Sequence, residues 1–219
     1  MNLKIIILYF KKKLMKKTIS ILLNFFVVIG VIFSCSLDKG INLDKLIIET
    51  VDNKSFHYLN GEPYTGRVYK LGQDNKSLLL DFNLLEGLIH EQYSEYNNNG
   101  SLIHNLFYKN GVLNGLEEKY YENGQLYESV NYVNGNFHGK RMVYWSNGIL
   151  KEQNHFTNGI LGGENLFYYS NGKLRKRLKF DSKGRKDGVW EDFLANGKLN
   201  QRVTYKNGKL IEITSSNEN

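Results

Sequence analysis

The sequence predicts an all-β protein, an elongated single-layer antiparallel meander of β-hairpin repeats preceded by an N-terminal signal helix. The first observation is a repeat: most Asn-Gly pairs follow one another in alternating steps of 11 and 13 residues, a 24-residue period. The second is that the runs between these turns alternate apolar and polar residues and are too short for helices. Turns this close leave no room for crossover helices, so neighbouring strands must pair antiparallel. The pairs begin at Asn99, Asn110, Asn123, Asn134, Asn147, Asn158, Asn171, Asn196 and Asn207.

Residues 1–34 have the features of a lipoprotein-type signal peptide. They contain six lysines and no acidic residue, and an apolar core over residues 21–33 follows the basic segment. A core of this length is short for an ordinary membrane-spanning helix. Cys35, the only cysteine in the chain, follows directly and is the predicted site of lipid attachment. Met15, which precedes two lysines, is an alternative start to Met1.

This N-terminus predicts a protein of the bacterial cell envelope that is lipid-anchored to a membrane, at the outer membrane or the cell surface. Acyl chains on Cys35 would hold the protein firmly, because stable attachment takes more than one chain. The alternative is an inner-membrane protein that keeps residues 1–34 as an uncleaved N-terminal anchor.

The net charge of +7 does not indicate nucleic-acid binding once the signal is subtracted. Of the 29 basic residues, six lie in residues 1–34, so the mature chain carries 23 basic and 22 acidic residues, a net charge of +1. One local basic cluster remains between residues 173 and 186, and it could meet anionic headgroups or an acidic partner. The alternative is a solvated strand face and turn. The candidate anion contacts are Arg175, Arg177, Lys183 and Arg185.

The mature chain divides into a tether and lead-in over residues 35–53, the repeat array over residues 54–213, and a polar tail over residues 214–219. Each Asn-Gly pair predicts a type I′ turn, because both residues tolerate positive φ. The spacing lengthens between Leu71 and Asn99, which predicts a longer hairpin or an irregular loop there.

Two classes of strand alternate in the array. In one class, Leu126, Glu128, Val130 and Tyr132 recur with period two, which places them on one face. The other class begins after a lone glycine and carries an aromatic residue five positions later. These aromatic residues are Tyr120, Tyr144, Tyr168 and Phe193.

The pattern Tyr-x-Asn-Gly-x-x-x-Gly, present from Tyr108 to Gly115 and from Tyr132 to Gly139, resembles the MORN-repeat variant of bacterial proteins. Residues 60–69 are similar to the opening repeat of that family, and the resemblance extends over residues 58–213. Many such proteins are called YwqK-like antitoxins. The resemblance therefore implies a β-hairpin array and, through that label alone, neutralisation of a partner toxin.

The sequence gives no sign of an enzyme, so we expect no catalytic residues, no metal site and no cofactor. The five histidines lie in different repeats without zinc-ligand spacing. Glu117 and Glu118 are adjacent, but consecutive strand residues point to opposite faces and cannot act jointly. The glycines fall at hairpin turns and form no phosphate-binding or nucleophile motif.

The aromatic residues are the strongest functional signal. Their structural role would be to stack in ladders across neighbouring strands of a sheet without a thick core. Because a single-layer sheet cannot hide both faces, a row of them could also form a contact surface for a protein partner. The candidate partner-binding residues are Tyr120, Tyr144, Trp145, Tyr168 and Trp190.

Three functions follow from these features. The first is a membrane-anchored, non-catalytic interaction module that binds an unknown protein partner at the cell envelope. The second is an antitoxin or immunity protein whose partner is a toxin. The third is an envelope structural protein that contacts lipid through the basic cluster.

Overall fold

The computed structural model describes residues 39–215. The predicted signal peptide and helix, the lipid-attachment residue Cys35 and the last four residues of the predicted tail lie outside the described residues. Between residues 39 and 215 the protein consists almost wholly of β-strands and turns, with one short 3₁₀-helix, η1 (Leu43–Lys45), and no α-helix. No helix in this part of the chain is both long and apolar enough to cross a membrane.

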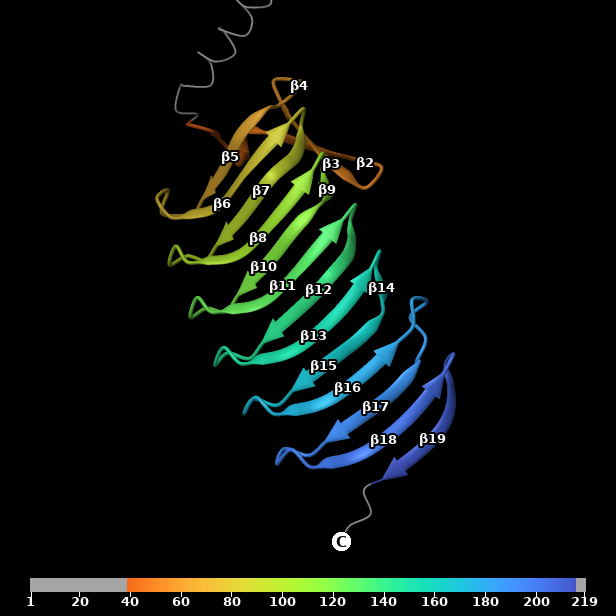
Figure 1. Ribbon diagram of the computed structural model, residues 1–219. Coiled ribbons are helices and arrows are strands. Elements are labelled where there is room, and N and C mark those ends of the chain that lie inside the picture. The colour runs from red at the N-terminus through yellow and green to blue at the C-terminus, as the bar shows by residue number, and fades with distance from the viewer. Residues whose placement is uncertain (1–38, 216–219) are drawn as a thin grey trace, which may run out of the picture. The chain divides into compact units, whose positions relative to one another are not determined.

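Sixteen of the described strands form one long sheet, in which consecutive hairpins lie side by side (Figure 1). Along the sheet the order is β1-β5-β6-β7-β8-β10-β11-β12-β13-β15-β16-β17-β18-β19, and β9 and β14 pair with β8 and β13. All neighbours from β5 to β19 are antiparallel, so the predicted meander is confirmed. The strands are β1 (Ile41–Asn42), β5 (Gly66–Leu71), β6 (Leu78–Leu85), β7 (Leu88–Tyr96), β8 (Leu102–Lys109), β9 (Val112–Leu113), β10 (Gly115–Tyr120), β11 (Leu126–Val133), β12 (Asn136–Tyr144), β13 (Leu150–Thr157), β14 (Ile160–Leu161), β15 (Gly163–Tyr168), β16 (Leu174–Phe180), β17 (Gly188–Phe193), β18 (Leu199–Lys206) and β19 (Lys209–Ser215).

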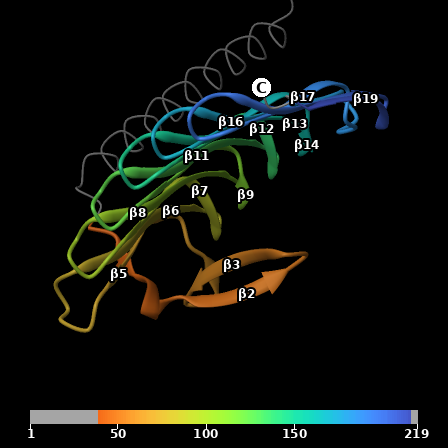
Figure 2. The same ribbon diagram turned by 90° about the horizontal axis from the view of Figure 1, so that it is seen from below.

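A second, three-stranded sheet covers the first strands of the long sheet. It consists of β2 (Ile47–Val51), β3 (Lys54–Leu59) and β4 (Glu62–Pro63). The long sheet is arched, and β2 and β3 lie on the inner side of the arch (Figure 2). The core lies between the two sheets, where Leu46, Val68, Phe82 and Leu84 are buried. Full burial of side chains of this size contributes about 1.5–3 kcal/mol each.

The Asn-Gly pairs form two kinds of turn, not one. Asn134 has φ 50° and Gly135 φ 78°, the two positive values of a type I′ turn. At Asn123-Gly124 only the glycine is positive, with φ 81°. There the Tyr121 amide donates to the Gln125 carbonyl at 2.8 Å, closing a longer loop with the glycine at a bulge. The predicted type I′ geometry is therefore wrong for the pairs at Asn99, Asn123, Asn147, Asn171 and Asn196.

The Asn-Gly pairs form two kinds of turn because their loops differ in length. The longer loop needs only one residue at positive φ, which the glycine supplies, so the asparagine is free for another role. The Asn123 side chain accepts a hydrogen bond from the Gln125 amide at 3.1 Å. Where the predicted spacing lengthened, β6 and β7 form a hairpin closed by Glu86 and Gly87, both at positive φ, with a register shift between Phe82 and Asn83.

A register shift recurs in every repeat beside the longer turn. It falls between Lys119 and Tyr120 in β10 and at the equivalent positions of β12, β15 and β17. Each predicted aromatic of the second strand class occupies such a shift. In each case the extra residue lies in the strand after the turn, so the aromatic residue keeps the alternation of its own strand, and Tyr120 shares a face with Glu118.

Candidate interaction surface

The register divides the side chains of the long sheet between an inner and an outer face. We call the inner face the one that carries Val68 and Phe82, which the small sheet covers. Cross-strand neighbours on this face form a middle row along the whole array. The row reads Val68, Phe82, Tyr93, Leu106, Glu117, Val130, Arg141, Asn154, Asn165, Leu178, Trp190, Val203 and Ile213.

The N-terminal end of this row is covered by the protein itself. Val68 is 0% exposed and Phe82 is 3% exposed, beneath residues of η1 and the small sheet. The His57 ring of β3 lies 5.9 Å from the Phe82 ring, and its Nδ1 atom lies 3.0 Å from the Gly87 carbonyl oxygen. The inner face therefore binds a β-hairpin at one end.

The centre of the inner face carries alternating acidic and basic side chains. His104 Nε2 lies 2.7 Å from Glu117 Oε1, and His104 Nδ1 lies 3.6 Å from Glu95 Oε2. Lys119 Nζ lies 3.2 Å from Glu117 Oε1 and 3.2 Å from Glu128 Oε2. Glu117 and Glu128 are thus each held by more than one cationic side chain or imidazole.

Arg141 continues this network towards the next repeat. Its Nε atom donates to Glu128, and its Nη1 atom donates to Glu152 Oε2 at 3.3 Å and to Asn154 Oδ1 at 3.1 Å. Glu117 and Glu128 are only 5% and 7% exposed. Carboxylates this buried need partners, because an unpaired buried charge is strongly destabilising.

The network shifts the pKa values of Glu117, Lys119 and Tyr132. The hydrogen bond from His104 lowers the pKa of Glu117 to about 2, with the Tyr132 hydroxyl and Lys119 adding to the effect and burial opposing it. Burial and the adjacent Glu117 carboxylate raise the pKa of Tyr132. Burial acts to lower the pKa of Lys119, but Glu117 and Glu128 outweigh it and the pKa is raised. Glu117 is therefore ionised at neutral pH and lies far from the range of a proton-transfer group.

The C-terminal end of the inner face is a shallow hollow. Its floor is apolar, formed by Leu178, Trp190, Val203 and Tyr205, and Lys176, Asp192 and Gln201 lie along it. Lys186 Nζ lies 4.3 Å from the centre of the Trp190 ring and 4.7 Å from that of Tyr205, a cation–π geometry. We call the eight residues that line it, these seven and Glu191, the C-terminal hollow. The small sheet that covers the other end of the row lies far from it along the array (Figure 1).

Rings stack along the inner face, but they are not the predicted set. Phe137 lies 5.0 Å from Tyr132 and 5.1 Å from Phe156, and Trp190 lies 5.2 Å from Phe180 and 5.0 Å from Tyr205. The ladder predicted for Tyr120, Tyr144, Tyr168 and Phe193 is therefore wrong: alternation along their own strands places these side chains on the outer face, and no ring contact among the described residues joins them to one another.

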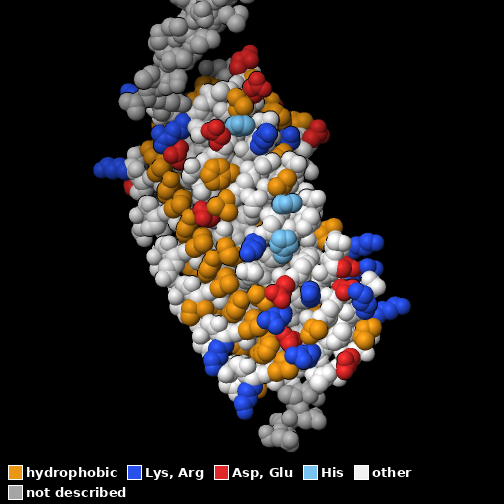
Figure 3. Space-filling view, viewed as in Figure 1, with side chains coloured by type: hydrophobic (Ala, Val, Ile, Leu, Met, Phe, Trp, Pro, Cys, Tyr) orange, Lys and Arg blue, Asp and Glu red, His pale blue; other side chains and the backbone are white. Residues whose placement is uncertain are grey.

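The outer face holds three of the five predicted partner-binding residues, Tyr120, Tyr144 and Tyr168. They are half-buried. The Tyr120 hydroxyl donates to Glu118 Oε2 at 3.0 Å, and the Tyr144 hydroxyl to Met142 Sδ at 3.5 Å. On the face turned to the viewer in Figure 3, hydrophobic side chains gather in a column along one side of the array.

The two tryptophans lie apart, so the five predicted residues do not form one surface. Trp190 is in the C-terminal hollow. Trp145 lies in the turn after β12, and its indole N–H donates to the Tyr168 carbonyl at 3.3 Å. The Tyr121 and Tyr169 hydroxyls make the equivalent bonds to Tyr144 and Phe193. The 24-residue spacing of Tyr121, Trp145 and Tyr169 was the sequence signal for this structural role.

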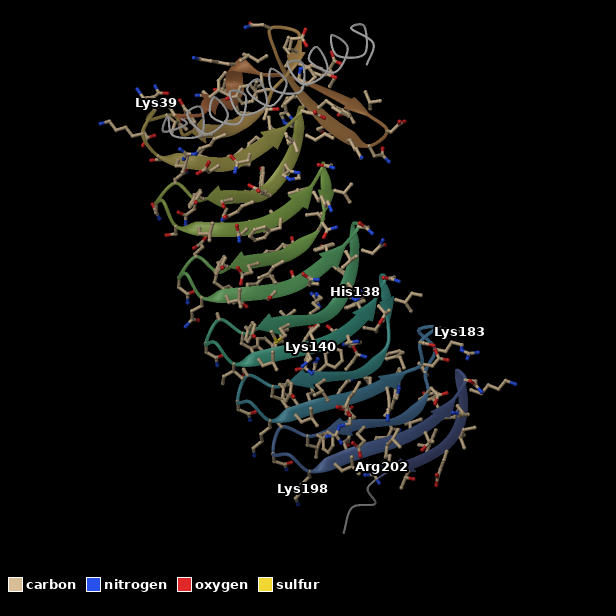
Figure 4. The ribbon with its side chains drawn as sticks, turned by 45° about the horizontal axis from the view of Figure 1, so that its top comes forward. Lys39, His138, Lys140, Lys183, Lys198 and Arg202 are labelled. Carbon is tan, nitrogen blue, oxygen red and sulfur yellow. The ribbon has the colours of Figure 1, made fainter. Side chains whose placement is uncertain are left out.

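The four predicted anion contacts are also separated. Arg177 pairs with Glu191 at 2.9 Å and Glu164 at 3.4 Å. Arg185 pairs with Asp181 at 2.7 Å and also donates to Asn207 at 3.2 Å. The Arg175 guanidinium lies 5.9 Å from the Phe167 ring centre. Lys183 is exposed in a turn and points away from the sheet, far from Arg202 and Lys198 (Figure 4). No basic pocket brings the four together.

Within residues 39–215, no group of three His, Cys, Asp or Glu side chains is arranged to hold a metal ion. Four consecutive segments of the chain match the MORN repeat variant. They span residues 113–134, 137–158, 161–181 and 186–207. These MORN repeats cover β10 to β18, which include the hollow and the salt-bridge network apart from Glu95 and His104. No curated protein matches the chain.

Each MORN repeat segment spans a strand that contains a glycine at or near its start, the longer turn, and the strand that follows. Gly115 begins the first of these strands at φ 129°, and a Cβ atom there would lie 2.8 Å from Phe107 Cβ. A glycine is therefore required at position 115, where the first MORN repeat packs against β8. The repeats build a sheet that presents side chains for interactions.

Proposed function

We propose that this chain is a non-catalytic interaction module of the bacterial cell envelope, which binds a protein partner through the C-terminal hollow. The observation that carries the proposal is the contrast between the two ends of the inner face. One continuous row is buried under the protein's own hairpin at Val68 and Phe82, whereas at Trp190 and Val203 it forms an open hollow.

The composition of the hollow fits a protein contact. Trp and Tyr are enriched at the energetically dominant positions of interfaces, where large side chains fill desolvated pockets. Trp190 and Tyr205 provide such a pair, and Lys176, Asp192 and Gln201 provide a polar surround that could select a partner. The charge network at the centre of the inner face is paired internally, so Glu128 offers no unpaired charge to a partner there.

Site-specific photo-crosslinking in cells tests this proposal. A photoreactive phenylalanine derivative at Trp190 is expected to give a defined adduct with a second protein. The same group at Tyr120 or Tyr144, on the outer face, serves as the control and is expected to give none. Adducts from Tyr144 but not from Trp190 would show that the outer face is the contact surface and would contradict the proposal.

The proposed anchor is the lipid on Cys35, supported by the basic and apolar segment before it. Fractionation of the wild type and Cys35→Ala, with the mass of the mature chain measured, tests it directly. Acylated wild type in the membrane fraction and a soluble Cys35→Ala variant are the expected results. A membrane-bound Cys35→Ala variant of full mass would instead indicate an uncleaved N-terminal anchor.

The identity of the crosslinked protein distinguishes an envelope scaffold from an antitoxin or immunity protein. A structural envelope protein would establish a scaffold function. A toxin whose activity falls when the hollow is occupied would establish an antitoxin or immunity function.

A further inference from the structure

Strand β7 carries a glutamate at a position where the later repeats carry glycine. In those repeats the glycine has a positive φ and lies opposite an aromatic residue of the next strand; the pairs are Gly115 with Tyr132, Gly139 with Phe156, Gly163 with Phe180 and Gly188 with Tyr205. In β7 the residue that lies opposite Tyr108 in the same way is Glu91, at φ 64°. Among residues 39–215, Glu91 is the one non-glycine residue of positive φ inside a strand, and the nine others lie between strands.

The backbone of Glu91 is strained, because residues with a side chain rarely adopt a positive φ, whereas glycine adopts it readily. Strained residues of this kind gather at functional sites, where the surrounding structure holds them in place. The Glu91 side chain is exposed and makes no ion pair within the described part of the chain. What this repeat gains over the others is therefore an exposed carboxylate.

Glu91 lines a hollow of about 530 Å³ on the outer face, formed by β6, β7 and β8. Asn83 and Phe107 each follow an inner-face residue, so strand alternation places both on the outer face. Asn83 lies opposite His90, and Phe107 lies opposite Gln92. A volume in this range is typical of sites for small ligands. We call it the outer hollow.

Several polar groups of the outer hollow have no partner in the fold. Neither the Asn83 amide nor the Lys109 ammonium group makes a side-chain hydrogen bond between residues 39 and 215. The Gln92 Nε2 atom donates to Ser94 Oγ at 3.1 Å and to Asn105 Oδ1 at 2.9 Å. Ser94 and Asn105 are buried, so they hold the Gln92 amide in place and leave its Oε1 atom to accept from a ligand.

The hollow also offers a further donor and an aromatic face. The His90 Nδ1 atom accepts from the Asn110 backbone amide at 3.3 Å, so the neutral ring carries its proton on Nε2. Phe107 is half-buried, and among the described residues no other ring packs against it. Donors, acceptors and one apolar ring therefore line the same hollow.

We infer that the outer hollow binds a neutral pyranose unit of a glycan. A sugar hydroxyl both donates and accepts hydrogen bonds, which matches a wall of amides, an imidazole, a carboxylate and an ammonium group. A pyranose ring also presents a face of C–H groups with partial positive charge, which is attracted to the negative face of the Phe107 ring. An anionic ligand fits less well, because the Glu91 carboxylate repels it and offsets the charge of Lys109.

A second, smaller hollow extends the site along the outer face. It has a volume of about 170 Å³ and shares Asn83 and Gln92 with the outer hollow. Arg67 Nε donates to Asp81 Oδ1 at 2.7 Å and Arg67 Nη2 to Asp81 Oδ2 at 2.8 Å, and this pair lines it together with Tyr96. Because the two hollows adjoin, we expect an oligosaccharide to bind more tightly than a single sugar.

This site is separate from the C-terminal hollow. It lies on the other face of the sheet, and β6 to β8 are far from β16 to β18 along the array (Figure 1). Glycan binding and the proposed protein contact can therefore be tested independently.

An array of neutral and anionic glycans, followed by titration calorimetry, tests the inference. The full chain is solubilised in a detergent without a sugar headgroup, because such a headgroup would compete for the site. A neutral oligosaccharide is expected to bind, and its affinity to fall at least tenfold in Asn83→Ala and in Glu91→Gly. Both variants should fold, because the Asn83 side chain makes no hydrogen bond in the fold and glycine is the residue that the later repeats use.

Asn131→Ala is the matched control, because Asn131 is a half-buried outer-face asparagine that lies outside both hollows. It is expected to leave glycan binding unchanged, as is Trp190→Ala in the C-terminal hollow. An equal loss in Asn83→Ala and Asn131→Ala, or a loss in Trp190→Ala alone, would show that the sugar binds elsewhere and would overturn the inference.

Two further measurements bear on the ligand and on Glu91. Binding of no neutral glycan, or only of anionic glycans, free amino acids or inorganic phosphate, would refute the inference. Glu91→Gly is expected to unfold at a temperature no lower than that of the wild type, because glycine relieves the strain. A less stable Glu91→Gly variant with unchanged glycan affinity would show that Glu91 serves the fold and not a ligand.

Discussion

The indole N–H of Trp145 donates a hydrogen bond to the backbone carbonyl of Tyr168, at 3.3 Å, in the following repeat. Tyr121 and Tyr169 do the same from the equivalent turns, with hydroxyl donors at 2.7 and 2.8 Å. The turns along this edge are therefore tied to one another as well as to their own strands. In a repeat array such nearest-neighbour contacts contribute much of the stability.

Removing one of these ties is expected to destabilise the array measurably. Tyr169→Phe deletes the donor to the Phe193 carbonyl and should lower the free energy of unfolding by about 1 kcal/mol. The urea midpoint measures this effect. Tyr168→Phe is the control, because it removes the hydroxyl of the neighbouring residue; an equal loss from both variants would contradict the assigned role.

Stability should fall in acid because of Glu117. Its pKa is lowered from 4.5 to about 2 in the folded protein, so the unfolded chain takes up the proton first as the pH drops. The contribution is present above pH 4.5 and is lost between pH 4.5 and 2. Thermal unfolding measured across this range should show a smaller pH dependence for Glu117→Gln than for Glu118→Gln, which changes the adjacent outer-face residue. Parallel pH profiles for the two variants would contradict this assignment.

In the two kinds of Asn-Gly turn, replacing the asparagine by glycine should have different effects on stability. Asn134 has φ 50°, so Asn134→Gly should be tolerated, whereas Asn134→Ala should cost about 1 kcal/mol for the left-handed conformation. Asn123 is not at positive φ, and Asn123→Gly loses its hydrogen bond to the Gln125 amide. Urea unfolding of the three variants checks this order. Equal effects of glycine at both positions would indicate a single turn type.

Two glycines should differ in their tolerance of a methyl group. Gly115→Ala places a Cβ 2.8 Å from Phe107 Cβ at φ 129°, whereas Gly124 has φ 81° and no atom within 4 Å of the new group. Both variants incur backbone strain of roughly 1–3 kcal/mol, and only the first adds a clash. Gly115→Ala should therefore unfold at a lower temperature than Gly124→Ala.

Much of the local structure of this protein could be predicted from its sequence. The spacing of Asn-Gly pairs and the period-two runs predicted an antiparallel meander, because turn chemistry and strand alternation act over a few residues. The opposite facing of Glu117 and Glu118 followed from the same alternation, and each now has partners on its own face. The 24-residue spacing also aligned Tyr121, Trp145 and Tyr169, although their shared role as turn-to-turn donors was not predicted.

The placement of the candidate site was decided by the tertiary structure. Alternation along β12 places Tyr144 on the face opposite Arg141, and only the small sheet, which covers Phe82, shows which of the two faces is the inner one. Trp145 and Trp190 were both candidate partner-binding residues. Trp145 instead donates a hydrogen bond to the Tyr168 carbonyl, whereas Trp190 lies on the floor of the C-terminal hollow.

The sequence by itself determined the repeat, the strand direction and the positions of the turns, since these depend on residues within one hairpin. Only the tertiary structure decided that Glu117 joins His104 and Lys119, that the small sheet covers Phe82, and that Trp190 lies in the hollow. Those contacts join strands from different hairpins. They depend on the register, arch and covering of the whole sheet, which no single repeat encodes.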